Sequence, residues 1–422
     1  MNVKIGKNPL NKGQVRIISS KSDAHRSLIA AALAEEESVL FVDGWSDDLE
    51  ATVRCLEALG AEIYKEPSGI EVVPVRRNAG GSAVLDCGES GSTLRFLLPV
   101  AAALGRYTTF TGQGRLPERP IGILLEEMAQ HGCSVNGDKL PVEIDGQLKS
   151  GVYTLPGNVS SQFITGLLFA LPLLEGDSEI RLTTDIESKG YIDMTLKTLK
   201  TFGIEVRNRE HGWYIPGGQA YNGPRMRFTE GDWSNAAFWL TAGAIKGSVG
   251  CQGLDMESAQ GDRAIVSLLE EFGAETKMIL NQITVTNKEM EGIRIDASQI
   301  PDLVPILCIA GAAAKGKTEI VNAGRLRLKE SDRLAVMAEC LRKIGVEVEE
   351  KEDGLVITGG CNPPAEEIVI DSHGDHRIVM AMAIAAVSLG VDITIINADA
   401  VNKSYPSFFI ELKKLGGVVD VL

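Results

Sequence analysis

The stretch IISSKSDAHRSLIAAALA, residues 17–34, sets the pattern for the whole chain. A strand-like run at residues 15–18 leads into polar residues at 19–26, and an apolar run at 27–34 follows. A helix that is apolar around its full circumference is buried on all sides. Its first N–H groups lack partners within the helix, and together with the helix dipole they attract an anion. We therefore predict a buried helix whose start, reinforced by Lys21 and Arg26, binds a negatively charged ligand.

The same arrangement recurs five more times along the chain. The polar segments are followed by apolar runs at residues 96–104, 163–174, 236–245, 303–314 and 378–389. After each run the sequence favours a strand and then an amphipathic helix that ends at a glycine, the residue expected in the left-handed cap. In the second copy this amphipathic helix is expected to start at Arg119-Pro120, because proline suits the first helical turn. Successive copies of this glycine are 72, 71, 70, 72 and 71 residues apart: Gly60, Gly132, Gly203, Gly273, Gly345 and Gly416. Six copies at one period predict an α/β repeat architecture.

The chain length divides this architecture into two domains. A chain of 422 residues has a prior of two or three domains, and six units of about 71 residues split into two sets of three near Glu230. Three small sheets around a bundle of buried helices would make one compact domain. If the helix starts of both domains face each other, the cleft between the domains attracts a ligand with several negative charges.

Composition excludes several classes of protein. The net charge of −15 argues against nucleic acid or an anionic membrane as the main partner, and no apolar run reaches the roughly 18 residues of a membrane helix. Seven scattered cysteines without a CxxC pair suggest reduced thiols, and five histidines show no metal-ligand spacing. The N-terminal residues lack the apolar core of a signal peptide. We expect a cytoplasmic protein without a metal.

One motif match is rejected as a nucleotide site. Residues 311–318, GAAAKGKT, satisfy the P-loop pattern letter for letter. A phosphate loop needs a strand before it and a helix after it, whereas here an apolar helical run precedes and a strand pattern follows. A P-loop ATPase that depends on Lys317 is therefore a weak alternative.

Three polar segments have both a structural and a functional interpretation. Residues 325–333, RLRLKESDR, read as a solvated helix start or as part of the anion site. Ser160, Ser161 and Gln162 read as a helix cap or as a phosphate-binding group. Arg377 directly precedes an apolar run, where it is hard to expose, and this favours a functional role.

Nine motifs, taken together, resemble one family along the whole chain. In order they are KSDAHR, GESGSTLR, LPERPIG, VSSQF, SKGYIDMTL, IPDLVPIL, RLKESDRL, GDHRI and NKSYPSFF, and they are similar to those of the EPSP synthase (3-phosphoshikimate 1-carboxyvinyltransferase) family. The resemblance implies a two-domain inside-out α/β fold with three βαβαββ units in each domain. It places residues 19–228 in the first domain, residues 1–18 and 229–422 in the second, and the active site in the interdomain cleft.

The resemblance also implies a reaction and its residues. The family transfers the enolpyruvyl group of phosphoenolpyruvate to the 5-hydroxyl of shikimate 3-phosphate and releases phosphate. The groups implied to bind shikimate 3-phosphate are Ser22, Arg26, Ser160, Ser161, Gln162, Ser188, Tyr191, Asp302 and Lys329. Those implied to bind phosphoenolpyruvate are Lys21, Gly91, Arg119, Gln162, Arg333, Arg377 and Lys403. The implied acid–base set is Lys21, Asp302 and Glu330, whose residue types suit proton transfer.

Some features extend or qualify this implication. No cofactor is required, and we expect a monomer whose partners are the two small substrates. In the family, the glycine at position 91 borders the site where glyphosate replaces phosphoenolpyruvate, so glyphosate sensitivity is expected. The alternative interpretation is that Gly91 is needed only for a turn with a positive φ. The chain departs from the family's frequent asparagines at Glu89 and Arg325.

Two further alternatives stay open at this point. UDP-N-acetylglucosamine enolpyruvyl transferase shares the fold, but it typically has Lys-Asn near its start, where this chain has Lys21-Ser22. A non-catalytic anion-binding repeat protein would be favoured by loss of Lys21 or Glu330, and both residues are present.

Overall fold

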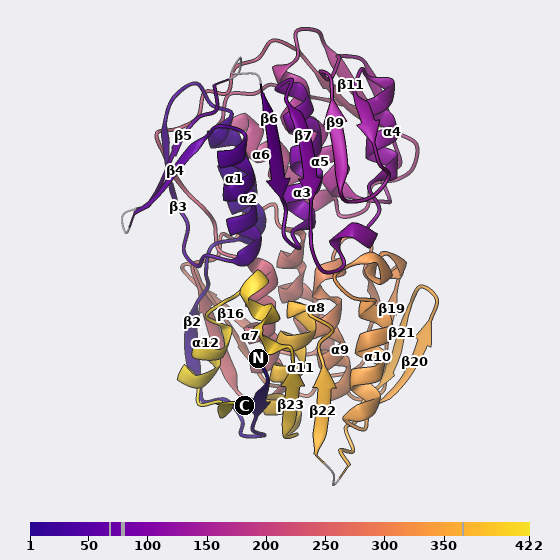
Figure 1. Cartoon of the computed structure of the whole chain (residues 1–422). Coiled ribbons are helices and arrows are strands. Elements are labelled where there is room, and N and C mark those ends of the chain that lie inside the picture. The colour runs from indigo at the N-terminus through magenta and orange to yellow at the C-terminus, as the bar shows by residue number, and fades with distance from the viewer. Residues whose placement is uncertain (67–68, 77–80, 365–366) are drawn as a thin grey trace. The chain divides into compact units, whose positions relative to one another are not determined.

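The chain forms two compact units in a computed structural model (Figure 1). The central unit is Ser19–Thr229, and the terminal unit combines Met1–Ile18 with Glu230–Leu422. The chain therefore crosses between the units twice, after Ile18 and after Thr229. The structure describes residues 1–66, 69–76, 81–364 and 367–422.

The central unit alternates helices and short strands. Its helices are α1 Lys21–Ala32, α2 Asp47–Ala58, α3 Gly91–Ala103, α4 Gly122–Gln130, α5 Ser161–Ala170 and α6 Lys189–Thr201, with 3₁₀ turns η1 Leu116–Glu118 and η2 Leu171–Leu173. Its strands are β3 Ser38–Phe41, β4 Glu62–Glu66, β5 Gly69–Val73, β6 Ser82–Asp86, β7 Tyr107–Thr111, β8 Ser134–Asn136, β9 Val142–Asp145, β10 Val152–Leu155, β11 Ser178–Leu182, β12 Arg207–Arg209, β13 Gly212–Ile215 and β14 Met226–Phe228.

The terminal unit repeats this alternation. Its helices are α7 Trp233–Ile245, α8 Ile265–Phe272, α9 Val304–Ala313, α10 Arg333–Lys343, α11 His376–Leu389 and α12 Phe408–Lys414, with 3₁₀ turns η3 Gly261–Ala264, η4 Pro301–Leu303, η5 Gly324–Leu328 and η6 Ala398–Lys403. Its strands are β1 Val3–Ile5, β2 Gly13–Arg16, β15 Ser248–Gln252, β16 Glu275–Ile279, β17 Gln282–Thr286, β18 Arg294–Asp296, β19 Lys317–Val321, β20 Glu347–Lys351, β21 Gly354–Thr358, β22 Ile368–Asp371, β23 Ile393–Ile396 and β24 Val419–Val421.

Each sheet among the described residues has four strands and one pairing pattern. A parallel pair is extended by two antiparallel pairs, as in β6-β7-β9-β8, whose first three strands lie side by side in Figure 1. In this sheet the crossover connection that a parallel pair needs is the buried helix α3. The other orders are β14-β3-β5-β4, β10-β11-β13-β12, β2-β15-β17-β16, β18-β19-β21-β20 and β22-β23-β1-β24. The expected α/β repeat fold is confirmed.

The double crossing changes which strands belong to which repeat. Strand β2 precedes α1 in the sequence but pairs with β15, in the terminal unit. Strand β14 precedes α7 but pairs with β3, so it completes the sheet of the first repeat. The strands of the first repeat are therefore not contiguous in the sequence. Hydrogen bonding within each sheet, rather than sequence order, assigns these two strands.

The apolar runs are buried helices, as predicted. Helices α7, α9 and α11 contact one another inside the terminal unit, and each unit has its own hydrophobic core. In the central unit α3 and α5 approach very closely. A side-chain carbon on Gly166 of α5 would lie 2.3 Å from the backbone oxygen of Arg95 in α3, so only glycine fits there.

Helix ends agree with the sequence in one respect and differ in another. All six repeat glycines have a positive φ, from +76° at Gly203 to +108° at Gly273, so the predicted left-handed positions are confirmed. The fourth helix, expected to start at Arg119-Pro120, begins at Gly122 instead. The backbone of Arg119 is extended at the end of η1, outside α4.

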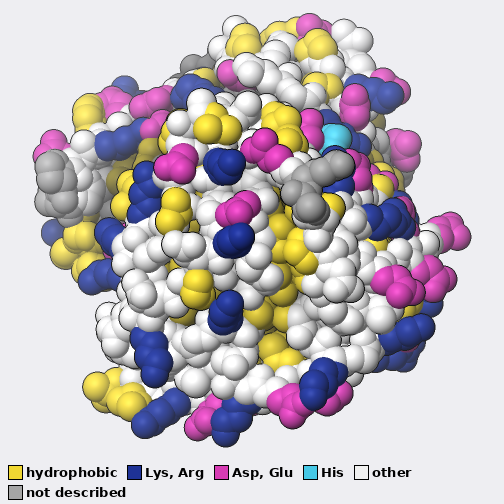
Figure 2. Space-filling view, turned by 90° about the horizontal axis from the view of Figure 1, so that it is seen from below, with side chains coloured by type: hydrophobic (Ala, Val, Ile, Leu, Met, Phe, Trp, Pro, Cys, Tyr) yellow, Lys and Arg dark blue, Asp and Glu magenta, His cyan; other side chains and the backbone are white. Residues whose placement is uncertain are grey.

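One face of the molecule carries charged side chains of both signs (Figure 2). On the face shown in Figure 2, acidic and basic side chains are interspersed with scattered hydrophobic ones. That face lacks the single-sign field that would attract a polyanion. Within the described parts of the chain, no helix is both long enough and apolar enough to cross a membrane.

Candidate functional site

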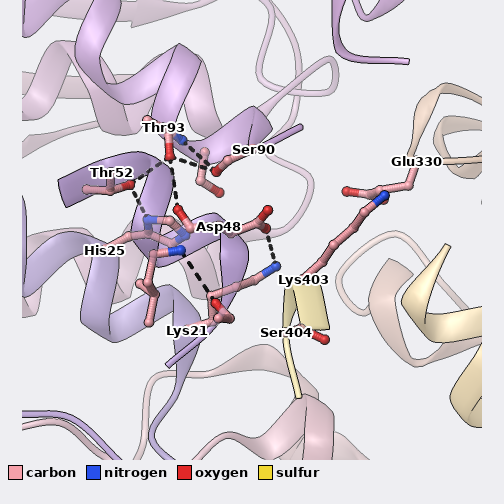
Figure 3. Close-up of polar contacts among 12 residues, drawn as sticks. Lys21, His25, Asp48, Thr52, Ser90, Thr93, Glu330, Lys403 and Ser404 are labelled. Atoms are coloured by element: carbon pink, nitrogen blue, oxygen red, sulfur yellow. Dashed lines mark hydrogen bonds and ion pairs between the residues drawn. The ribbon is translucent and has the colours of Figure 1, made fainter. Parts of the chain in front are cut away.

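Helix α1 carries three of the predicted site residues in its first turns. Ser20 caps the helix by accepting a hydrogen bond from the backbone N–H of Asp23. Lys21, the first helical residue, forms an ion pair with Asp48 of α2, with 2.6 Å between Nζ and Oδ2 (Figure 3). Both side chains are largely shielded from solvent, so the pair holds the ammonium group in one place.

Arg26 lies one turn beyond Ser22 and is almost completely buried. Its guanidinium donates to the Thr195 hydroxyl at 2.9 Å and to the backbone oxygens of Ser22 and Tyr191 at 2.7 and 2.8 Å. Burial lowers the pKa of Arg26 to about 10, although the charge of Asp23 opposes the shift. Arg26 is therefore a fixed cation at neutral pH, and it ties α1 to α6.

A second group joins the starts of α3 and α5. Arg95 donates to the side-chain oxygen of Gln162 at 2.8 Å, and Gln162 donates to the Ser92 hydroxyl at 3.0 Å. Ser160 is the cap of α5 and accepts from the backbone N–H of Gln162. Hydrogen bonds to both its oxygen and its nitrogen therefore fix the orientation of the Gln162 amide, between the starts of α3 and α5.

Gly91 and Arg119 meet at the start of α3. Gly91 is the first residue of the helix, and it is not one of the glycines with positive φ. A side-chain carbon at Gly91 would lie 2.8 Å from the guanidinium carbon of Arg119. The interpretation of Gly91 as a turn residue that needs a positive φ was therefore wrong. Its missing side chain makes room for the buried guanidinium of Arg119 instead.

The terminal unit contains a cluster of ion pairs centred on Arg333. This side chain is 1% exposed and donates to Asp375 at 2.8 Å, Glu330 at 2.7 Å and Asp302 at 2.9 Å. Burial by itself would lower the pKa of Arg333, but the three carboxylates raise it above its usual value. One buried guanidinium therefore fixes three carboxylates, two of which belong to the predicted acid–base set.

Asp302 is surrounded by further cations. Arg377 donates to its carboxylate at 3.1 Å, and Lys329 lies 3.7 Å from it. Burial lowers the pKa of Lys329 to about 8, although Asp302 opposes this shift. Lys403 at the end of η6 donates to the backbone oxygen of Gly374 at 2.8 Å, next to the cap of α11. The five predicted residues of this region share one cluster, with Lys403 at the adjoining helix start.

The remaining predicted residues lie at helix starts in the central unit. Ser161 is the first residue of α5, and Ser188 precedes α6 in a left-handed conformation with φ of 55°. Tyr191 lies in the first turn of α6. The predicted acid–base set is divided between the units, with Lys21 in one and Asp302 and Glu330 in the other. Its assembly into one set stays a prediction.

The structure decides two of the open alternatives. Arg325 donates to the backbone oxygen of Ser298, and Arg327 pairs with Asp332 and Glu350, so these two arginines stabilise the local fold. The P-loop match ends a helix, α9, and leads into strand β19, the reverse of the required order. The ATPase interpretation has no structural basis.

Several residues of these clusters were not predicted from the sequence. Asp48 looked like an ordinary acidic residue in a first helical turn, and Thr195 was assigned no role although it lies inside the motif SKGYIDMTL. Arg95 lies inside the motif GESGSTLR, and that position was the signal that could have identified it. Asp262, a buried carboxyl that accepts from Ser234, also escaped notice. Such residues are recognised only through partners that are distant in sequence.

Comparisons with known proteins agree on one family. The family model of EPSP synthase (3-phosphoshikimate 1-carboxyvinyltransferase) matches residues 6–412. A 3-phosphoshikimate 1-carboxyvinyltransferase of Clostridium novyi is 43% identical, over 99% of this chain and 98% of that protein. The corresponding protein of Clostridium acetobutylicum is 44% identical, over 97% and 96%.

Solved structures give the same result for the fold. The structure of EPSP synthase from Acinetobacter baumannii has a TM-score of 0.81 and 27% identity, with full coverage of both chains. The enolpyruvyl transferase NikO from Streptomyces tendae, at 16% identity and a TM-score of 0.79, shares the fold. On this sequence and structural similarity over nearly its full length, the chain belongs to the EPSP synthase family.

Proposed function

We propose that this protein transfers the enolpyruvyl group of phosphoenolpyruvate to the 5-hydroxyl of shikimate 3-phosphate and releases phosphate, a step of aromatic amino acid biosynthesis. The observation that carries the proposal is the similarity, over almost the whole chain, to curated proteins named for carboxyvinyl transfer to 3-phosphoshikimate. Both substrates are anions, and the ionic clusters of both units suit anionic ligands.

In this proposal the central unit supplies most of the contacts to shikimate 3-phosphate. Arg26 is a buried cation whose position is fixed by three hydrogen bonds. The helix starts around Ser160, Ser161 and Ser188 offer hydroxyl and N–H donors. Phosphate and ring hydroxyls need such a mixture of charge and directed donors. Lys329 and Asp302 of the terminal unit act on the same substrate.

Phosphoenolpyruvate is proposed to bind to cations of both units. Arginine holds carboxylate and phosphate groups through two parallel hydrogen bonds, so Arg119, Arg333 and Arg377 are suited to its two anionic ends. Lys21 and Lys403 add point charges. Gly91 is proposed to shape this site through Arg119, because the absence of a side chain at Gly91 leaves room for the guanidinium.

The reaction needs an acid and a base. The 5-hydroxyl oxygen bonds to the substituted carbon of phosphoenolpyruvate as its proton leaves, and the methylene carbon gains a proton. Phosphate then departs and the new methyl group loses a proton, which restores the double bond. Asp302 and Glu330, with Lys21, are the proposed proton-transfer groups. The arginine bonds to both carboxylates restrict them to defined orientations.

A coupled phosphate-release assay tests the function. Phosphate should appear only when phosphoenolpyruvate and shikimate 3-phosphate are both present. UDP-N-acetylglucosamine in place of shikimate 3-phosphate should give no release above background. Release with UDP-N-acetylglucosamine alone as acceptor would support the sister reaction instead. The sequence leads us to expect a monomer, which size-exclusion chromatography tests. It also leads us to expect a cytoplasmic location, which cell fractionation tests.

A further inference from the structure

A chain of buried hydrogen bonds links three helices beside Lys21. His25 Nδ1 lies 2.7 Å from the Thr52 hydroxyl, and that oxygen lies 2.6 Å from the Thr93 hydroxyl. Thr93 in turn lies 2.7 Å from the Ser90 hydroxyl, which caps α3. Figure 3 shows these contacts as a continuous series of dashed lines. His25, Thr52 and Thr93 are fully buried, and Ser90 is nearly so.

This series of hydrogen bonds lies beside the ion pair between Lys21 and Asp48. Lys21 and His25 are one turn apart on α1, and Asp48 and Thr52 are one turn apart on α2. The two helices are therefore joined twice, by the Lys21–Asp48 pair and by the His25–Thr52 hydrogen bond. Thr93 extends the second connection to α3, and its hydroxyl also lies 3.4 Å from the backbone oxygen of Asp48.

The protonation state of His25 determines which group donates and which accepts in each of these hydrogen bonds. Burial, followed by the charges of Lys21 and Arg26, lowers the pKa of His25 well below its usual value, so the ring is neutral. Nε2 has no hydrogen-bond partner among the described residues. A buried N–H without a partner is costlier than a bare acceptor nitrogen, so the proton belongs on Nδ1. The hydrogen bonds then run from His25 through Thr52 and Thr93 to Ser90, whose oxygen also accepts the backbone N–H of Thr93.

We propose that His25, Thr52 and Thr93 are positioning residues that fix Lys21 and the first turn of α3, at Gly91, for phosphoenolpyruvate. This inference rests on the proposed function. The series of hydrogen bonds joins the helices that carry Lys21, Asp48 and Gly91, directly behind these residues. A lost link frees α1, α2 and α3 to shift relative to one another, and a small misplacement of a binding group is costly. Arg26 is held separately by Thr195 and Tyr191 of α6, so binding of shikimate 3-phosphate should be spared.

The test replaces one hydroxyl in the middle of the chain. Thr52→Val keeps the shape of the side chain but removes two hydrogen bonds, and the KM for phosphoenolpyruvate should rise roughly tenfold. The Kd for shikimate 3-phosphate, measured by titration calorimetry, should stay within about twofold. Thr52→Ser restores the hydroxyl and should restore the KM. Thr93→Val interrupts the chain on another helix and should reproduce the effect of Thr52→Val.

Thr108→Val is the matched control. Thr108 is also a fully buried threonine of the central unit, but its hydroxyl has no hydrogen-bond partner among the described residues. Its removal should leave both constants unchanged. An unchanged KM for phosphoenolpyruvate in Thr52→Val would overturn the inference. An equal rise in the KM for phosphoenolpyruvate and in the Kd for shikimate 3-phosphate would overturn it as well. A wild-type protein that forms no product would contradict the proposed function itself, and the inference with it.

Discussion

A methyl group on Gly91 would lie 2.8 Å from the guanidinium carbon of Arg119, closer than two such carbons can approach. The glycine at the start of α3 is therefore matched to the position of this arginine. Because Gly91 does not have a positive φ, alanine is compatible with its backbone. The effect of a substitution is transmitted through Arg119, whose side chain has to give way.

This relationship gives a prediction for inhibition. Gly91→Ala should raise the inhibition constant for glyphosate by a larger factor than the KM for phosphoenolpyruvate, because glyphosate is the longer of the two ligands. The wild-type enzyme should be sensitive to glyphosate. Steady-state inhibition kinetics on both variants measure the two constants. Gly122→Ala is the control, since Gly122 also begins a helix and its side-chain carbon would meet nothing within 4 Å. Equal changes in both constants would contradict the proposed geometry.

A second prediction concerns proton transfer by Glu330. Glu330→Gln keeps an oxygen that can accept from Arg333, but it removes the ionisable group. Turnover should fall by ~10²–10⁴, while the Kd for shikimate 3-phosphate changes little. Glu350→Gln is the control, because Glu350 is another arginine-bound glutamate of the terminal unit and pairs with Arg327. Near-normal turnover of Glu330→Gln would exclude Glu330 from the acid–base set.

Lys329 predicts a pH dependence of substrate binding. Its pKa is lowered to about 8, mainly by burial. The charged form binds the phosphate better, so above pH 8 binding requires uptake of a proton. Affinity for shikimate 3-phosphate should therefore fall by up to about tenfold per pH unit above this value. Lys329→Arg, which stays protonated, should abolish the fall. A wild-type Kd that is constant from about pH 7 to about pH 9.5, a range that spans the pKa, would rule out this role.

Asp262 predicts a pH dependence of stability. Burial, with the charge of Asp302, raises its pKa to about 7. Between about pH 4 and 7 the unfolded chain has lost this proton while the folded chain retains it, so the carboxyl lowers stability as the pH rises. Asp262→Asn should lose less thermal stability than the wild type between these pH values. Asp420→Asn, at an exposed position, should follow the wild type. If the melting temperatures of Asp262→Asn and of the wild type change equally with pH, the pKa of Asp262 is not raised in the folded protein.

The repeat architecture could be predicted because its signals are local. Gly60 and its five counterparts need a left-handed conformation that few other residues adopt, so one residue type marks every repeat. Buried helices are likewise recognisable from an unbroken apolar run. The start of α4 was misplaced because proline suits a first helical turn, yet Pro120 lies just before the helix.

What escaped prediction depends on residues far apart in the sequence. Strand β14 joins the sheet of the first repeat through its pairing with β3, for which the short strand holds no specific signal. Thr52 belongs to none of the motifs, and Thr93 was assigned no role inside GESGSTLR; only the folded structure brings their hydroxyls together. The site residues themselves came from resemblance to a family, while the structure supplied their partners.

The central claim is transfer of an enolpyruvyl group, and the most direct test is product formation in heavy water. The enzyme is incubated in D₂O with shikimate 3-phosphate and phosphoenolpyruvate, and the product is analysed by NMR spectroscopy and mass spectrometry. Addition followed by elimination predicts an enolpyruvyl ether at the 5-oxygen of shikimate 3-phosphate, with deuterium in its methylene group. Phosphate release without this ether, or an ether formed only on UDP-N-acetylglucosamine, would contradict the claim.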